Sequence, residues 1–92
     1  MTRASDTFEI VNELGLHARA AVKLTQVAQR FPACEVTVSR DGQPANAKSV
    51  MGVLLLCAAK GAKISIMADG DGAEEAVVAI GELIAARFGE PR

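Results

Sequence analysis

Gly15-Leu16-His17-Ala18-Arg19 joins two segments of different periodicity, and it is the most informative stretch of the chain. The segment before it, residues 7–11, alternates with the period of two that is typical of a half-buried strand. From Ala18 to Phe31 apolar residues recur every three or four positions, which predicts a helix with one buried stripe. The pattern therefore places His17, the only histidine, where a strand ends and a helix begins.

The start of a helix is a favourable place for an anion. Its first backbone N–H groups have no partner within the helix, and the aligned dipoles give that end a charge of about +0.5. Arg19 adds a permanent cation whose planar donors match phosphate oxygens. The combination with an imidazole at His17 indicates a group that can carry a phosphoryl group, although a histidine at such a position is more often a plain surface cap.

Length and composition exclude several classes of protein. A chain of 92 residues predicts one small domain. No apolar run approaches the ~20 residues that cross a membrane, and residues 1–6 lack the apolar core of a signal peptide. We therefore expect a cytoplasmic protein without membrane insertion. A net charge of −1, with three phenylalanines and no tryptophan or tyrosine, argues against nucleic-acid binding.

No residue pattern indicates a metal or a cofactor. Cys34 and Cys57 match neither a CxxC nor a zinc pattern, and with a single histidine no four-ligand metal site can be assembled. We interpret both cysteines as small hydrophobic residues in a reducing compartment. Asp69-Gly70-Asp71-Gly72 resembles the beginning of a calcium loop, but the later ligands are missing, so we expect a turn. The expectation is no metal and no cofactor.

The remaining segments predict an α+β domain. Asp41-Gly42 is a hairpin signal, Pro44 suits an edge strand and Ser49 is a natural N-cap. Apolar and polar residues alternate along the strands, which predicts an antiparallel sheet with one face exposed to solvent. The two long helices are expected to cover the other face. We expect a single domain over residues 1–92 with an ordered core at about 7–89. The predicted order is β-α-β-β-α-β-α over residues 7–11, 18–31, 34–39, 43–47, 50–57, 63–69 and 73–88.

The run Val50-Met51-Gly52-Val53-Leu54-Leu55-Leu56 is more apolar than a two-turn helix on a sheet requires. We expect Val50, Met51 and Leu54 to reach the surface as a partner site; the alternative is that loops bury the whole run. The Ser49 hydroxyl leaves two interpretations. It either only caps the helix, contributing ~1 kcal/mol, or also accepts a phosphate of charge about −2 that blocks docking without unfolding the helix.

Two motifs together resemble a known family. Gly15-Leu16-His17-Ala18-Arg19 is followed about thirty residues later by Ala47-Lys48-Ser49-Val50-Met51-Gly52-Val53. This pair resembles the HPr family, the histidine phosphocarriers of the phosphoenolpyruvate-dependent phosphotransferase system. The similarity covers roughly Phe8 to Phe88. It implies an open-faced β-sandwich, a four-stranded antiparallel sheet of order 1-4-2-3 covered on one face by three helices.

The resemblance also implies roles for particular residues. The histidine that matches His17 accepts phosphate on Nδ1 from phosphorylated enzyme I and passes it to EIIA-type domains, assisted by the arginine that matches Arg19. The serine that matches Ser49 is modified by HPr kinase/phosphorylase in lineages that possess it. We therefore expect a monomeric carrier that is not an independent catalyst. Backbone phosphate contacts are expected from Ala18 and Arg19. The expected partner surface comprises Ala20, Lys23, Leu24, Val50, Met51 and Leu54.

Two departures from the family pattern bear on the rate and affinity of transfer. Ala20 stands where most members have proline, which restores one backbone donor and removes some stiffness. Gln26 and Gln29 stand where some members have lysines, so that Lys23 and Arg30 remain to attract acidic partners.

The sequence also makes one prediction about Ser49 and leaves two alternative functions open. Val50-Met51-Gly52 is closer to the kinase-regulated form of the family, which predicts that Ser49 can be phosphorylated. A nitrogen-branch or purely regulatory carrier would use the same histidine, and a binding module would use no phosphoryl chemistry at all. An ordinary enzyme is disfavoured, because no motif places a second acid–base group near His17.

Overall fold

The computed structural model describes residues 2–92 as four strands, three α-helices and one 3₁₀ turn. The sheet order is β1-β4-β2-β3, and every neighbouring pair is antiparallel. The predicted fold class and strand order are therefore confirmed. The elements are β1 (Arg3–Glu9), α1 (Ala18–Ala28), β2 (Cys34–Arg40), β3 (Gln43–Asn46), α2 (Val50–Leu54), β4 (Lys63–Gly70), α3 (Ala73–Ala85) and η1 (Arg87–Gly89).

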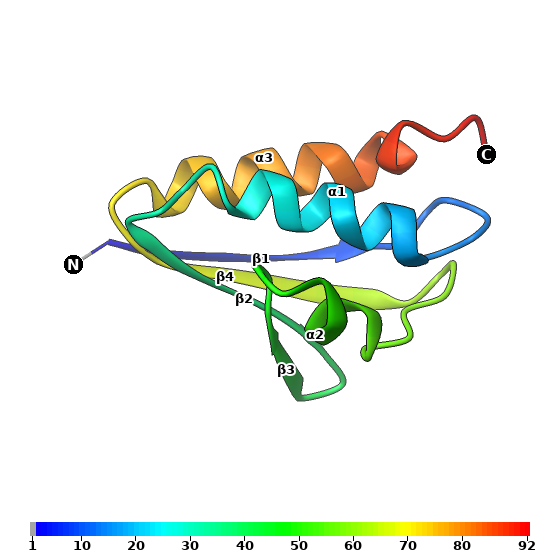
Figure 1. The fold of residues 1–92 in the computed structure, drawn as a ribbon, viewed down its shortest axis with the longest axis horizontal. Helices are drawn as coiled ribbons and strands as arrows, with labels where there is room; N and C mark the ends of the chain where they lie inside the picture. Colours follow the sequence, from blue (N-terminus) through cyan, green and yellow to red (C-terminus); the bar gives the residue numbers. More distant parts are fainter. Residues whose placement is uncertain (1) are drawn as a thin grey trace.

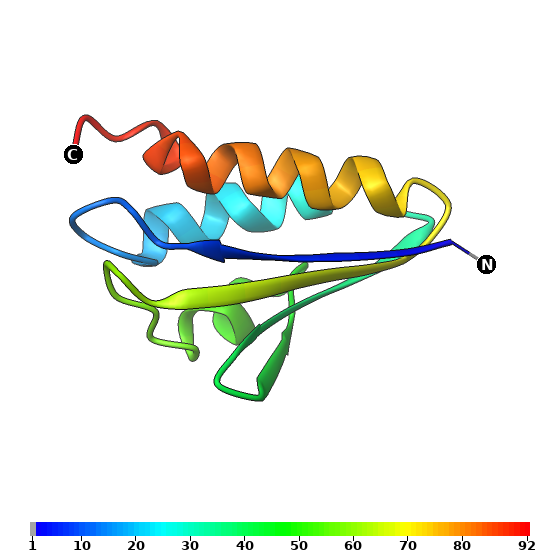
Figure 2. The ribbon, with the colours of Figure 1, turned by 180° about the vertical axis from the view of Figure 1, so that it is seen from behind.

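The sheet has one covered face and one open face. α1 and α3 run side by side along it, with α3 over β1 and β4, and the short α2 lies next to α1 and β3 (Figures 1 and 2). Register places Val38 opposite Ile66 on the helix side, where both are fully buried. On the open side Thr7 lies opposite Ser65, and their hydroxyls are 3.1 Å apart. Alternation along β2 and β4, the two central strands, therefore separates the core from solvent. No helix within residues 2–92 has the length and apolar content needed to cross a bilayer.

The buried stripe of α1 corrects part of the expected partner surface. Ala20 and Leu24 have no exposed area, because they lie on the stripe that packs against the sheet and α3. The prediction that these two residues contact partners is wrong. The same periodicity that predicted the helix had already placed them on its inner face.

At both ends of the described chain the elements differ from the predicted bounds. β1 begins at Arg3 and not at residue 7, because β4 is long enough to pair with it as far as Arg3 opposite Asp69. At the other end α3 stops at Ala85, and Arg87 and Phe88 have left-handed φ values of 58° and 55°. Pairing with a distant strand and a left-handed turn leave no trace in local periodicity.

The central helix is also shorter than expected. α2 ends at Leu54, three residues before the predicted limit, and Cys57 follows in a left-handed conformation with φ 51°. Cys57 is exposed and does not pack in the core, whereas Cys34 is buried, as a small hydrophobic residue there would be.

The loop between β1 and α1 is fixed by backbone contacts. Gly15 has a φ of 70°, and the next amide, Leu16 N–H, donates to the Ala58 carbonyl at 2.8 Å. A Cβ on Gly15 would lie 2.7 Å from that carbonyl oxygen. The buried Asn12 donates from Nδ2 to the Gly15 carbonyl at 2.8 Å. These contacts set the point at which α1 begins.

Leu24→Ala should destabilise the protein far more than Val22→Ala. Leu24 is fully buried and Val22 is 38% exposed, although both lie on α1. We expect a loss of about 2–5 kcal/mol for Leu24→Ala and less than about 1 kcal/mol for Val22→Ala, measured by urea unfolding. Equal losses would contradict the placement of Leu24 in the core.

Gly15→Ala should cost more than Gly61→Ala. Both glycines have positive φ, 70° and 89°, so each substitution should cost about 1–2 kcal/mol of backbone strain. Only at Gly15 would the new methyl meet main chain; nothing lies within 4 Å at Gly61. We expect a further loss of about 1–3 kcal/mol at Gly15, measured by thermal unfolding. If both variants have the same melting temperature, the close approach to Ala58 does not add to the loss of stability.

Candidate functional site

His17 is the N-cap residue of α1, and its side chain is not used for capping. Its backbone is extended, with φ −79° and ψ 178°, and its carbonyl accepts the first helical hydrogen bond from Ala21 N–H at 2.8 Å. The imidazole makes no capping hydrogen bond, and the side chain is 27% exposed. The interpretation of His17 as a plain surface cap therefore fails, and the ring is available for other chemistry.

One imidazole nitrogen is held by a residue from the far end of the chain. His17 Nε2 is hydrogen-bonded to the Glu90 carboxylate, from a residue 73 positions away. The second Glu90 oxygen, Oε1, accepts from Asn12 Nδ2 at 2.9 Å. The Asn12 amide must direct its Nδ2 toward both partners, because the Gly15 carbonyl and the Glu90 carboxylate can only accept hydrogen bonds. No local motif marks Glu90, so the sequence pattern does not predict its place beside His17.

Glu90 remains ionised to acidic pH. The hydrogen bonds from His17 and Asn12 lower the pKa of its carboxyl below the ordinary value; the charges of His17 and Lys23 act in the same direction, and burial opposes them. A depressed carboxyl pKa stabilises the folded state above the ordinary glutamate pKa. That contribution is lost as the pH falls through the lowered pKa. At neutral pH the carboxylate is therefore an acceptor only.

The other imidazole nitrogen, Nδ1, is uncommitted. Within residues 2–92 no group is hydrogen-bonded to it. A cleft of about 370 Å³ opens beside the ring, between the loop that precedes α1 and the C-terminal segment, and it is lined in part by Leu14, Arg19 and Pro91. Arg19 is exposed and forms no ion pair with the described part of the chain. The cleft is thus lined by His17, by Arg19 and by the C-terminal segment that carries Glu90.

Ser49 is the N-cap of α2, as its position in the sequence indicates. Its Oγ accepts from Gly52 N–H at 3.2 Å, and the residue is half-buried. The short helix that follows exposes Met51 (66%) and, unexpectedly, Leu55 (74%), whereas Val50 and Leu54 are only half exposed because they pack against the core.

Lys23 has a structural contact that the sequence does not reveal. Its Nζ donates to the Phe88 carbonyl at 2.6 Å, and Phe88 is fully buried. This bond ties α1 to the turn after α3. Lys23 is therefore half-buried at the base of the C-terminal segment, and only part of it is available to a partner.

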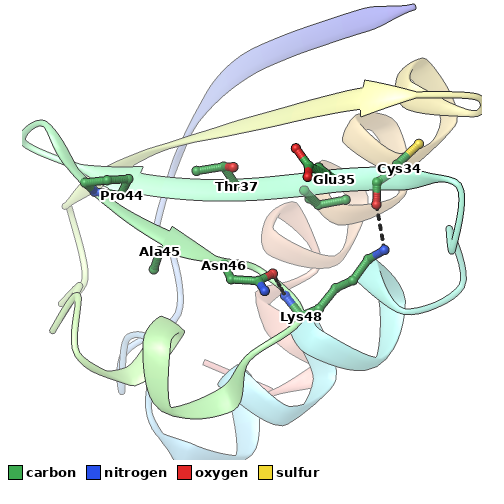
Figure 3. Close-up of a pocket in the computed structure, with 8 residues that line it drawn as sticks. Cys34, Glu35, Thr37, Pro44, Ala45, Asn46 and Lys48 are labelled. Atoms are coloured by element: carbon green, nitrogen blue, oxygen red, sulfur yellow. Dashed lines mark hydrogen bonds between the residues drawn. The ribbon is translucent and has the colours of Figure 1, made fainter.

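A larger hollow, of about 450 Å³, lies where β3 separates from β2 (Figure 3). Lys48 reaches across it, and its Nζ donates to the carbonyls of Cys34 at 2.6 Å and Phe31 at 2.9 Å. β3 pairs with β2 only from Thr37 to Arg40, so no β3 amide reaches the Cys34 carbonyl. The Lys48 ammonium group donates to that carbonyl instead. Neither His17 nor Arg19 lines this hollow.

Comparison with known proteins identifies a family over most of the chain. A family model described as "PTS HPr component phosphorylation site" matches residues 4–86. The phosphocarrier protein HPr of Cupriavidus necator is 49% identical over 81 residues, covering 88% of this chain and 90% of that protein. The phosphocarrier protein NPr of Shewanella violacea is 41% identical over 90 residues, covering 98% of each.

Solved structures agree with the sequence comparison. HPr-C-His from Thermoanaerobacter tengcongensis superposes with a TM-score of 0.91 at 39% identity, covering 97% of this chain and 99% of that one. An HPr dimer from the same organism has a TM-score of 0.75 at 41% identity, covering 90% and 94%. The chain belongs to the HPr family, the phosphocarrier proteins of the phosphotransferase system, which carry phosphoryl groups and are not independent catalysts.

Proposed function

We propose that the protein accepts a phosphoryl group on Nδ1 of His17 from phosphorylated enzyme I and passes it to an EIIA-type domain. The observation that carries this proposal is the uncommitted Nδ1 of His17 at the start of α1, because His17 and Arg19 line the same cleft. We place this exchange in the cytoplasm and treat the carrier as a monomer. No cofactor takes part, because the imidazole is itself the acceptor.

The transfer requires no separate base. The Nδ1 lone pair of a neutral imidazole attacks phosphorus, the N–P bond of the donor breaks, and its electron pair stays with the donor. The backbone N–H groups of Ala18 and Arg19 lie at the positive end of α1 and favour the phosphoryl oxygens. The Arg19 guanidinium adds charge-assisted donors. Because Ala20 replaces the usual proline, the first turn keeps a further amide.

The partner surface that we propose is centred on α2. The exposed side chains of Met51 and Leu55 form its apolar part, and Val50 and Leu54 contribute their half-exposed atoms. Exposed apolar residues of this size on a small domain commonly mark a docking site. Phosphate on Ser49, at the start of the same helix, would add about two negative charges beside this surface. HPr kinase/phosphorylase is the enzyme that we propose for that modification.

A nitrogen-branch or regulatory carrier is the second candidate. It is favoured by the similarity to a phosphocarrier protein NPr, which extends over 98% of both chains. The phosphoryl chemistry at His17 would be the same, and only the final acceptor would differ. Phosphoryl transfer from the loaded carrier to purified sugar-branch and nitrogen-branch EIIA domains, compared side by side, separates the two.

Incubation with phosphoenolpyruvate and enzyme I should load one acid-labile, alkali-stable phosphate onto the protein. His17→Ala should carry none, because the acceptor nitrogen is gone, and Arg19→Ala should load about tenfold more slowly, because a charge-assisted contact is lost. Radiolabel retention after acid and alkali treatment measures the outcome, and thermal unfolding confirms that both variants fold. An acid-stable label, or label that persists in His17→Ala, would overturn the proposal.

Ser49→Asp should weaken docking to enzyme I, whereas Ser49→Asn should not. Both residues cap a helix well, so α2 is preserved in each, and only aspartate places a charge beside Met51. We expect a loss of about tenfold in affinity for the aspartate variant, measured by titration calorimetry. If both variants bind as the unsubstituted protein does, phosphate on Ser49 does not act by blocking this surface.

A further inference from the structure

We propose that Glu90 is a positioning residue for phosphoryl transfer: its carboxylate holds His17 in the tautomer that carries hydrogen on Nε2 and a lone pair on Nδ1. The inference rests on the proposed function and assigns a role to the C-terminal segment, residues 87–92. Glu90 contacts the ring nitrogen that does not react, so it acts through His17 and not on the phosphoryl group.

The direction of the hydrogen bond determines the tautomer. An ionised carboxylate can only accept, so Nε2 must donate, and in a neutral imidazole the other nitrogen then keeps its lone pair. Asn12 Nδ2 occupies the second carboxylate oxygen at 2.9 Å, and Asn12 has no exposed area. Because both carboxylate oxygens are engaged, Glu90 cannot rotate away from the ring without losing a partner. The arrangement fixes the ring as well as its protonation.

The chain adopts an unusual conformation to place Glu90 there. Arg87, Phe88 and Gly89 have successive φ values of 58°, 55° and 79°, and the first two are conformations that L side chains rarely adopt. Such a turn persists only where the surroundings impose it. Here Phe88 is fully buried, and its carbonyl accepts from Lys23 Nζ at 2.6 Å. Figure 1 shows the segment, in red, leaving α3 and passing the loop before α1.

The tail is held on the far side of Glu90 as well. Glu13 N–H donates to the Arg92 carbonyl at 3.1 Å, and an Arg92 guanidinium nitrogen lies 4.0 Å from a Glu13 carboxylate oxygen. Glu90 therefore lies between two attachments, the turn at Phe88 and the backbone bond at Arg92. Its side chain is 16% exposed. The C-terminal segment is thus attached on both sides of Glu90 and covers the Nε2 edge of the imidazole.

Charges around the pair favour an ionised Glu90. The cations are Lys23 and Arg19 from α1 and Arg92 from the tail, and the other carboxylate is Glu13 from the loop before α1. Lys23 also lowers the pKa of Glu90, in addition to the hydrogen bonds from His17 and Asn12. The hydrogen bonds and the charge of Lys23 together favour the ionised carboxylate, which is therefore available as an acceptor.

The role extends through the transfer itself. When Nδ1 of His17 forms its bond to phosphorus, the donor N–P bond breaks and its electron pair stays on the donor. The ring keeps its Nε2 hydrogen and gains a positive charge, which the Glu90 carboxylate balances. When phosphorus leaves for the acceptor, the pair of the broken bond returns to Nδ1 and the same neutral tautomer is restored. No proton has to arrive or leave in either direction.

The test uses Glu90→Ala, Glu90→Gln and, as a control of equal charge change, Glu82→Gln on the exposed side of α3. Imidazole 15N shifts are recorded at about pH 9, where an ordinary imidazole is neutral. We expect hydrogen on Nε2 in the unsubstituted protein and in Glu82→Gln, and a mixture of tautomers in Glu90→Ala. Phosphoryl loading from enzyme I should slow about three- to tenfold in both Glu90 variants. Glu90→Gln keeps the shape of the side chain, so this variant carries the test if Glu90→Ala does not fold.

The outcomes separate this inference from the proposed function. If the unsubstituted protein takes no acid-labile phosphate from enzyme I, the carrier function itself fails. If that protein loads normally, and Glu90→Ala and Glu90→Gln show the same tautomer and loading rate, the positioning role is wrong. A purely structural role for Glu90 would lower the melting temperature and leave the tautomer unchanged.

Discussion

The hydrogen bonds that meet at the Glu90 carboxylate connect the loop before α1 with the C-terminal segment at His17. The loop before α1 contributes Asn12, the start of α1 contributes His17, and the turn after α3 contributes the carboxylate. Each partner depends on packing elsewhere: Asn12 on the Gly15 loop, and the turn on buried Phe88. A half-exposed ring is thereby held in one orientation by residues that are themselves fixed, which is what a site on a small domain needs for rapid transfer.

The sheet and helices provide this rigidity while leaving the reactive side accessible. α1 buries a stripe of small and branched residues against the sheet and α3, so its first turn cannot shift without disturbing the core. The first N–H groups of α1 have no partner within the helix, and Arg19 from the same turn lines the cleft beside His17. α2, by contrast, buries little more than Val53 and presents Met51 and Leu55 outward. In the proposed function, α1 therefore positions the phosphoryl acceptor and α2 provides the surface on which a partner docks.

Local signals in the sequence were sufficient for the elements and for part of the site. His17 and Ser49 both lie at helix starts, and both positions follow from the pattern of neighbouring residues. Glu90 could not be found in this way, because its contact spans 73 residues and depends on a left-handed turn at Arg87 and Phe88. The early start of β1 was missed for a similar reason, since it depends on the length of its distant partner β4.

The central claim is that Nδ1 of His17 is the phosphoryl acceptor while Nε2 keeps its hydrogen against Glu90. Long-range 1H–15N and 31P spectra of the 15N-labelled protein, loaded from phosphoenolpyruvate through enzyme I, test this directly. We expect coupling of phosphorus to Nδ1 of His17 and a proton on Nε2. Phosphorus bonded to Nε2, the nitrogen that Glu90 holds, would contradict it.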